Sequence, residues 1–244
     1  MPNPTNQSQG YDATLRALHW LMALLIATAA GIGLWMTELP MQDEADFATA
    51  MQVFSVHKTI GIAAFLLALL RIAWALTRPP PGPLHPERKA ETLLAALTHW
   101  SLYGAMLVMP LSGWLYSSAN PGYAPIFWPF LQSLPFVPAD EALGKVFQTV
   151  HVTSSYVLYG AAALHVLGAF KHALIDRDGT LARMTTGRGP SVPPVTRHLL
   201  PALLALVLWA ATIGAGIATA PKPEPDPFAE FGEGADSLEE VPAP

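Results

Sequence analysis

The chain of 244 residues contains no cysteine. Without a thiol the protein cannot form disulfides, thiolate zinc sites, iron–sulfur clusters or the covalent attachment of c-type haem. Charged residues are scarce, at 13% against the roughly 25% of a soluble globular domain, whereas hydrophobic residues make up 52%. These shortages indicate a membrane protein, in which the eight histidines, rather than thiolates, are the natural metal ligands.

Positive charge is also in short supply, because 13 lysines and arginines stand against 18 carboxylates and give a net charge of −5. A nucleic-acid-binding protein needs a basic face to offset the phosphates, so we expect no nucleic-acid partner. The sequence has neither a phosphate-binding glycine loop nor the nucleophile elbow of a hydrolase. Any chemistry is therefore expected to depend on histidine.

Five apolar stretches are each about 20 residues or longer, enough to cross roughly 30 Å of hydrocarbon as a helix. The connections are polar or rich in proline, as between Arg78 and Pro86, where a helix cannot continue. The segment 126–138 mixes Phe, Trp and Pro, which is typical of an interfacial segment rather than of a sixth span. We expect an all-α integral membrane protein whose spans cover residues 17–37, 53–77, 93–117, 146–173 and 198–220.

Basic residues in short loops favour the cytoplasmic side of a membrane. A cytoplasmic amino terminus places ten of the 13 basic residues inside and leaves only Lys58, Lys145 and Lys222 outside. The tail at 221–244 would then be periplasmic. Because this tail is acidic, rich in proline and poor in apolar residues, we expect it to be disordered.

Four histidines in the spans fall at two depths. His57 begins the second span and His151 begins the fourth, so both lie at the outer level, whereas His19 begins the first span at the inner level. His165 follows His151 by 14 residues, about 21 Å at about 1.5 Å per residue, which brings it to the inner level with His19. At about 100° per residue the two span-four histidines face the same way. Two stacked histidine pairs are the arrangement needed to hold two six-coordinate haems.

A histidine inside a membrane is costly to bury, which makes it a functional candidate by default. The plainer alternative, a histidine bonded to a neighbouring serine or carbonyl, suits one histidine better than four at matched depths. Two axial imidazoles leave haem iron without an open site, which suits electron transfer better than oxygen activation. Small residues such as Gly61, Gly104 and Gly113 would let a flat macrocycle approach the backbone, although small residues also serve ordinary helix packing.

Other polar residues near the inner level have two readings each. His99 is either a third partner near the inner haem or a quinone contact, or else a plain interfacial histidine. His172 lies two turns beyond the inner pair, where it is either a contact for a quinone head group or an ordinary helix-end residue. Arg71 either sets the topology or pairs with a haem propionate. His85 and His198 are interpreted as solvated loop residues.

The sequences around these histidines match a known pattern. The matching stretches are YDATLRALHW at 11–20, HKTIG at 57–61 followed by Arg71, His99 with Pro110 and Gly113, and the segment from His151 through KH at 171–172 to DGTLARM at 178–184. Over about residues 11–185 the chain thus resembles the prokaryotic cytochrome b561 family of dihaem membrane proteins.

The resemblance implies a four-helix transmembrane bundle at 11–185 that holds two non-covalent b-type haems. Its ligands would be His19 and His165 for the inner haem, and His57 and His151 for the outer one. The fifth helix at 198–220 and the tail at 221–244 lie outside the family pattern.

The resemblance also implies electron exchange between a periplasmic donor or acceptor and ubiquinone at the bacterial inner membrane. Lys171 and His172 are the candidates for the inner quinone contact. One branch of the family oxidises superoxide and reduces ubiquinone, which is a narrower version of the same function.

A second interpretation makes the chain the haem-binding membrane anchor subunit of a larger dehydrogenase or hydrogenase. The sequence alone leaves open whether the chain is a quinone-linked oxidoreductase by itself or an electron carrier for a partner. A haem-free transporter or structural bundle is a third interpretation, and the depth-matched histidines count against it.

Overall fold

The computed structural model describes residues 10–77, 81–122, 124–128, 130, 132–190, 192–193 and 199–222. Its long helices are α1 (Ala13–Met36), α2 (Glu44–Leu76), α3 (Lys89–Ala119), α4 (Glu141–Phe170) and α6 (Leu200–Thr219). A π-helical segment, η1 (Lys171–Asp176), prolongs α4, and the short α5 (Thr180–Thr185) follows it. The described residues contain no strand. Five helices, with η1 counted as part of the fourth, are long and apolar enough to cross a membrane, which confirms the all-α membrane fold.

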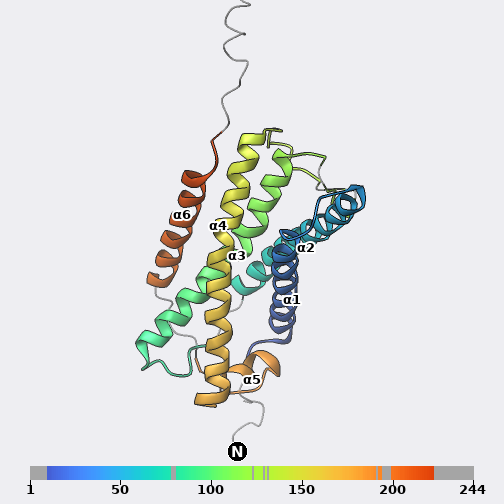
Figure 1. Cartoon of the computed structure of the whole chain (residues 1–244). Helices are drawn as coiled ribbons and strands as arrows, with labels where there is room; N and C mark the ends of the chain where they lie inside the picture. The colour runs from blue at the N-terminus through green and yellow to red at the C-terminus, as the bar shows by residue number, and fades with distance from the viewer. Residues whose placement is uncertain are drawn as a thin grey trace, which may run out of the picture.

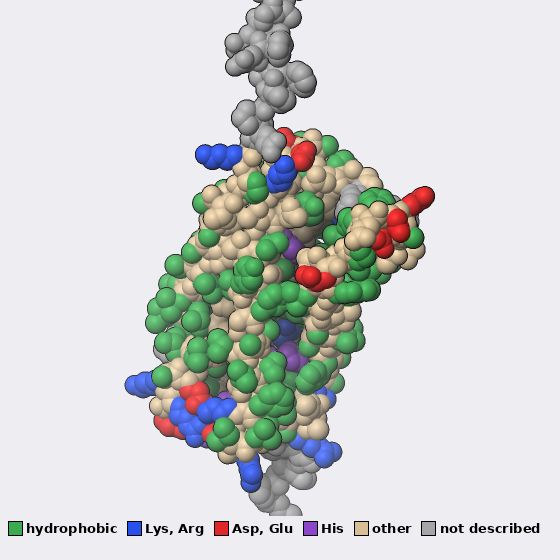
Figure 2. Space-filling view, viewed as in Figure 1, with side chains coloured by type: hydrophobic (Ala, Val, Ile, Leu, Met, Phe, Trp, Pro, Cys, Tyr) green, Lys and Arg blue, Asp and Glu red, His purple; other side chains and the backbone are tan. Residues whose placement is uncertain are grey.

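The helices run alternately up and down (Figure 1). The end of the bundle where the chain begins, drawn at the bottom of Figure 1, is called the lower end, and the opposite end is called the upper end. α1 packs against α2, α3 packs against α4, and α6 packs against both α3 and α4. Apolar side chains cover the middle of the molecule, while charged side chains gather at its two ends (Figure 2).

Aspartate side chains fix the start of three helices. Asp12, Asp43 and Asp140 each accept a hydrogen bond of 2.7 to 2.9 Å from the backbone N–H three residues later. Such a cap satisfies a donor that the helix leaves free and complements the positive end of the helix dipole. Because of its cap, α2 begins at residue 44 instead of the expected residue 53, and its first turns project from the upper end of the bundle (Figure 1).

The packing between α1, α2 and α3 uses small and flexible side chains. Met22, Ala64, Ala68 and Met106 form a buried cluster there. Towards the upper end, the segment before α4 places Ile126 against α2 and α3, and its described residues form no helix.

Helix α6 is fitted closely to the bundle. Its buried residues recur every three or four positions, and among them Trp209 is only 5% exposed. The indole N–H of Trp209 donates a 3.1 Å hydrogen bond to the carbonyl of Ser101, and a Cβ atom at Gly104 would collide with the indole ring. Gly104 therefore serves helix packing, the second of the two roles considered for the small residues. The structure describes only residues 221–222 of the tail, so the expected disorder of the rest lies outside the described residues.

Candidate functional site

The upper histidine pair lies between α2 and α4. The ring centroids of His57 and His151 are 6.2 Å apart, with an angle of 86° between the ring planes. A metal–imidazole bond is about 2 Å long, so two imidazoles on opposite sides of one metal ion have centroids roughly 6 Å apart. The structure thus brings the two outer candidates to a separation that fits one shared iron.

Hydrogen bonds fix which nitrogen of each ring is free. The Nδ1 atom of His57 lies 3.1 Å from the carbonyl oxygen of Ala29, and Nδ1 of His151 lies 2.9 Å from that of Met109. Because a carbonyl only accepts, each Nδ1 carries the proton and each Nε2 is left as the metal-binding atom. Metal-ligating histidines in proteins usually donate their second N–H in this way.

Glycines leave room around the same two rings. A Cβ atom at Gly33 would lie 3.1 Å from Cε1 of His57, and one at Gly113 would lie 3.1 Å from Cε1 of His151. Gly61 follows His57 by one helical turn on the same face, and its position faces open space. The backbone approaches both imidazoles where any side chain would intrude, which suits a site for a flat macrocycle.

The lower pair joins α1 to α4. The ring centroids of His19 and His165 are 6.0 Å apart, again close to the separation expected across one metal ion. Histidine side chains are visible at different depths of the molecule in Figure 2. The four histidines that were predicted at two levels therefore do meet as two pairs.

Arg71 of α2 reaches the lower pair. Its Nη2 lies 3.3 Å from Nδ1 of His19, and its guanidinium lies 5.5 Å from the ring centroid of Tyr103. A guanidinium only donates, so Nδ1 of His19 is the acceptor in this contact, and binding of iron through Nε2 of His19 would move the ring proton to Nδ1 and replace the contact. The buried Nε of Arg71 has no hydrogen-bond partner within the described part of the chain. A free N–H of a buried guanidinium fits a carboxylate such as a haem propionate.

His99 of α3 is a third histidine at the lower level. Its ring centroid is 5.0 Å from that of His165, nearer than the centroid of His19. Its Nδ1 lies 2.6 Å from the carbonyl oxygen of Ala95, which leaves Nε2 free. The structure thus places His99 beside the lower pair, and the choice of ligands at this level belongs to the proposals below.

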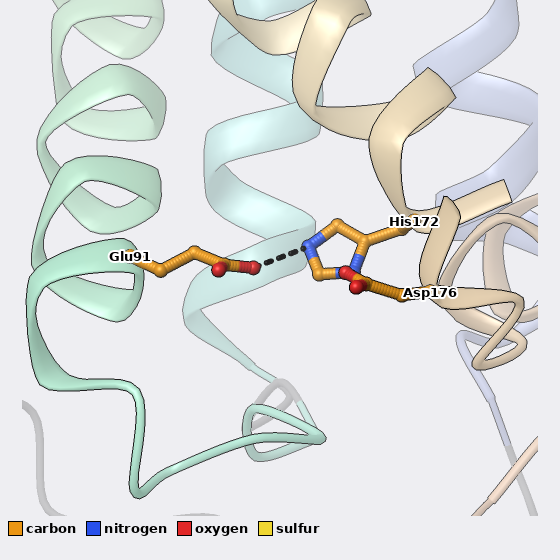
Figure 3. A group of neighbouring side chains, drawn as sticks. All are labelled: Glu91, His172 and Asp176. Atoms are coloured by element: carbon orange, nitrogen blue, oxygen red, sulfur yellow. Dashed lines mark ion pairs between the residues drawn. The ribbon is translucent and has the colours of Figure 1, made fainter. Parts of the chain in front are cut away.

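Lys171 and His172 lie in η1, within a cluster of charges at the lower end. Figure 3 shows His172 between Glu91 and Asp176 of this cluster. The Nζ of Lys171 lies 2.8 Å from a carboxylate oxygen of Glu91 and 2.6 Å from one of Asp176. The Nε2 of His172 lies 3.4 Å from Glu91, and its Nδ1 lies 2.7 Å from Oδ2 of Asp178. A metal ion could find ligands in this cluster, from Glu91, His172 and Asp176. The ammonium of Lys171, however, already supplies the positive charge between the two carboxylates.

A cavity of about 340 Å³ adjoins this cluster, and His172 lines it together with Arg177, Leu181 and Thr185. Short π-helical segments inside α-helices are rare and frequently mark functional sites. Of the two residues predicted to contact quinone, His172 therefore faces a cavity, whereas Lys171 is engaged with carboxylates.

Asp178 and His85 were not among the candidate residues. Burial raises the pKa of the Asp178 carboxyl, but hydrogen bonds from the backbone and side chain of Thr180 and from His172 outweigh it and lower the pKa to about 2. His85 was interpreted as a solvated loop residue, yet its Nε2 lies 3.2 Å from Oδ2 of Asp178. No short motif predicts this contact, because it joins the loop before α3 to the segment after η1. His198 lies outside the described residues.

Comparison with known proteins adds a second kind of evidence. A family profile described as prokaryotic cytochrome b561 matches residues 10–187. The chain belongs to the prokaryotic cytochrome b561 family. The match includes all the histidines placed above and ends before α6.

Three curated relatives support the family membership. Cytochrome b561 homolog 2 of Escherichia coli (strain K12) is 30% identical over 181 residues, which are 74% of this chain and 93% of the relative. Cytochrome b561 homolog 1 of the same organism is 27% identical over 181 residues, 73% of this chain and 98% of the relative. A protein named probable superoxide oxidase CybB, from Yersinia pestis, is 28% identical over 178 residues, 71% of this chain and 94% of the relative.

Membership of the cytochrome b561 family identifies the chain as a multi-pass membrane protein that binds b-type haem and transfers electrons. Haem binding fits the observed side chains, since imidazoles with free Nε2 atoms and glycines against their rings are what a b-type haem needs from the protein. The haem supplies a one-electron redox centre, and the protein supplies the ligands, the orientation and the surrounding charge.

Proposed function

We propose that the chain carries electrons through two b-type haems between a periplasmic redox partner and ubiquinone at the bacterial inner membrane. His57 and His151 would hold the upper haem, on the periplasmic side, and His19 and His165 the lower haem, on the cytoplasmic side. The observation that carries the proposal is the pair of imidazole separations, 6.2 Å and 6.0 Å, at two levels of one bundle.

The same distance argument favours His19 over His99 as the partner of His165. Imidazoles on opposite sides of one metal ion need centroids roughly 6 Å apart, and the 5.0 Å between His99 and His165 is too short for that. We therefore assign His99 a place beside the lower haem and not on its iron. Arg71, with its free Nε–H, is the proposed partner of a propionate of this haem.

The proposed ubiquinone site lies at the lower end, in the cavity lined by His172. Reduction of a quinone to a quinol takes two electrons and two protons and forms two O–H bonds. Electrons arrive singly through haem, whereas the protons must come from groups that touch the quinone. An imidazole can both take up and release a proton, and His172 is the imidazole among the residues that line this cavity, so we assign it the proton exchange. We assign Lys171 the fixing of the carboxylates around it.

Superoxide is the electron donor that we propose for the upper end, because one relative is named a probable superoxide oxidase. Each superoxide would give up one electron and leave as dioxygen, so two would serve each ubiquinone. Lys58, next to His57, places its ammonium at the upper end, where it donates a 2.9 Å hydrogen bond to the carbonyl of Ala124. A cation beside the upper haem ligand would attract a small anion over a short range, although the outer carboxylates oppose it at long range.

Haem content tests the ligand assignment. The purified His165→Ala and His19→Ala variants should each lose one of two haems and keep the upper one, and His151→Ala should keep the lower one. His99→Ala is the matched control, because it removes an imidazole at the same level and should retain both haems. Loss of haem in His99→Ala, or equal loss of both haems in any single variant, would show that the pairing is wrong.

Stopped-flow reduction of the haems tests the two substrates. Ubiquinol should reduce the wild-type haems, and His172→Ala should slow that reaction while keeping both haems. Superoxide should reduce the haems of the same variant at the wild-type rate, because it acts at the opposite end. Equal ubiquinol rates in wild type and variant would place the quinone elsewhere, and no reduction by superoxide would exclude it as the donor.

A further inference from the structure

A row of titratable side chains leads from the lower surface to the cavity that His172 lines. His85 lies outermost, with 30% of its side chain exposed, and Asp178 comes next, with only 8% exposed. His172 follows and reaches the cavity. Oδ2 of Asp178 lies 3.2 Å from Nε2 of His85 and 2.7 Å from Nδ1 of His172, so one carboxylate oxygen serves both imidazoles.

The two contacts of Asp178 differ in quality. The contact with His172 is a hydrogen bond, whereas the contact with His85 is an ion-pair distance alone, and the buried Nε2 of His85 has no hydrogen-bond partner among the described residues. A hydrogen bond from Nε2 of His85 to Asp178 would complete the row. On its other side, Nδ1 of His85 lies 3.3 Å from Glu87, whose side chain is 67% exposed. One nitrogen of His85 therefore contacts an exposed carboxylate, and the other lies against Asp178.

The carboxylate of Asp178 is held in place independently of the histidines. Its Oδ1 accepts a 2.9 Å hydrogen bond from the backbone N–H of Thr180 at the start of α5. This leaves Oδ2 directed to the two rings. A carboxylate fixed between two imidazoles stabilises a proton on either of them, by a charge-assisted hydrogen bond.

We propose that His85, Asp178 and His172 form the route by which protons pass between the cytoplasm and the quinone cavity. This inference rests on the proposed quinone function. For each ubiquinone reduced, the two electrons come through the haems and two protons enter from water by way of His85. His172 would take a proton from Asp178 on one ring nitrogen and give the proton of its other nitrogen to a quinone oxygen, and a turn of the ring would then restore the starting arrangement for the second proton. Oxidation of a quinol runs the same transfers in reverse.

Asp178 passes the proton on and does not store it. Its pKa of about 2 keeps it a carboxylate at neutral pH, so a proton that arrives from His85 would stay on it only briefly before it moves to His172. Other charged groups also face this row from the packed elements. They are Glu87 beside His85, Glu91 and Asp176 beside His172, and Lys171 and Arg88, which pair with those two carboxylates.

Chemical rescue separates proton transfer from a structural role. In His85→Ala, stopped-flow reduction of the haems by ubiquinol should slow roughly tenfold, below the 10²–10⁴ of a general acid or base that touches its substrate. Free imidazole in the buffer should restore most of the rate, while the quinone Kd and the haem content stay at wild-type values. His85→Gln, which keeps the size of the side chain, should show the same loss and the same rescue. Lys89→Ala is the control, because it removes an exposed charge from the adjacent first residue of α3 and should leave the rate unchanged.

The outcomes distinguish the two proposals. If wild type reacts with ubiquinol and His172→Ala is slow, but both His85 variants keep the wild-type rate, the quinone site stands and the route through His85 is wrong. A loss in the His85 variants that imidazole does not restore, or a weakened quinone Kd, would also overturn the route. If ubiquinol fails to reduce the wild-type haems, the quinone function and the proton route both fail.

Discussion

Gly113 lies against the imidazole of His151, and replacing it by alanine perturbs one proposed haem ligand directly. The new Cβ atom would sit 3.1 Å from Cε1 and 3.2 Å from Nδ1 of that ring, so the ring must shift by a few tenths of an ångström. Two contacts hold the ring where it is, one of 2.9 Å from Nδ1 to the carbonyl oxygen of Met109 and one of 3.1 Å to Oγ of Ser112. The shift would therefore strain the orientation of the ligand.

The size of the effect follows from these contacts. Overpacking a tight site costs about 1–3 kcal/mol, and weakening a hydrogen bond adds about 1 kcal/mol. Because 1.4 kcal/mol corresponds to about tenfold in affinity, the combined cost of about 2–4 kcal/mol should weaken binding of the upper haem roughly 30- to 700-fold. Alanine also raises helix propensity by about 1 kcal/mol, so the unfolding temperature of the whole protein should change little.

The measurement is transfer of haem to an excess of an apo haem protein, followed by the absorption spectrum. Gly113→Ala should release its upper haem faster than wild type and keep its lower haem. Gly33→Ala should behave alike, because its Cβ would lie 3.1 Å from Cε1 of His57. Gly160→Ala on α4 is the matched control, since its Cβ would meet nothing within 4 Å. Equal haem release from Gly113→Ala and Gly160→Ala would refute the reasoning.

Three further predictions concern other parts of the molecule. Trp209→Ala should destabilise the protein by about 3 kcal/mol in thermal unfolding, because the indole is buried against α3 and α4. Both haem spectra should stay intact, since the indole does not line a proposed haem site, and a changed spectrum would contradict this. The pKa of Asp178 is lowered from 3.8 to about 2, which contributes about 2 kcal/mol to the free energy of unfolding. This contribution is present above about pH 4 and is lost as the pH falls towards 2, so Asp178→Asn should be less stable at pH 7 and should lack this pH dependence in thermal unfolding. Parallel curves of unfolding temperature against pH for the two proteins would contradict the prediction. Arg71→Gln should lower the midpoint potential of the lower haem by an amount on the order of tens of millivolts in a redox titration, because a nearby cation favours the reduced iron. The potential of the upper haem should not change. Equal shifts of both potentials would argue against the placement of Arg71 beside the lower haem.

The depths of the four histidines could be predicted because they depend on helix geometry alone. The rise and turn of an α-helix fix where His165 lies relative to His151, and the alternation of spans fixes which histidines they meet. The same arithmetic put His99 at the lower level, but it carries no information on which ring lies nearest to His165. That depends on how far α1 and α3 approach α4, which packing sets.

The contact between His85 and Asp178 could not be predicted from a sequence pattern. Asp178 and His85 are separated by a whole span and a loop, and their contact depends on how η1 turns into α5. The role of Gly104 could not be predicted either. A small residue on a helix face can make room for a macrocycle or for a tryptophan of a neighbouring helix, and only the position of that helix decides between the two. The early start of α2 could have been predicted from Asp43, which is a residue type that caps helices. The prediction placed the start at residue 53 instead, because it followed the apolar run.

The vertical separation of the two histidine levels has an electrical consequence. His151 and His165 share α4 and lie about 21 Å apart along its axis, which is roughly two-thirds of a hydrocarbon layer of about 30 Å. Moving one elementary charge across the whole layer involves about 2.3 kcal/mol per 100 mV of membrane potential, so passage between the two levels involves roughly 1.6 kcal/mol. Electron transfer along this bundle would therefore be sensitive to the membrane voltage, and an inward electron current would work against an inside-negative potential.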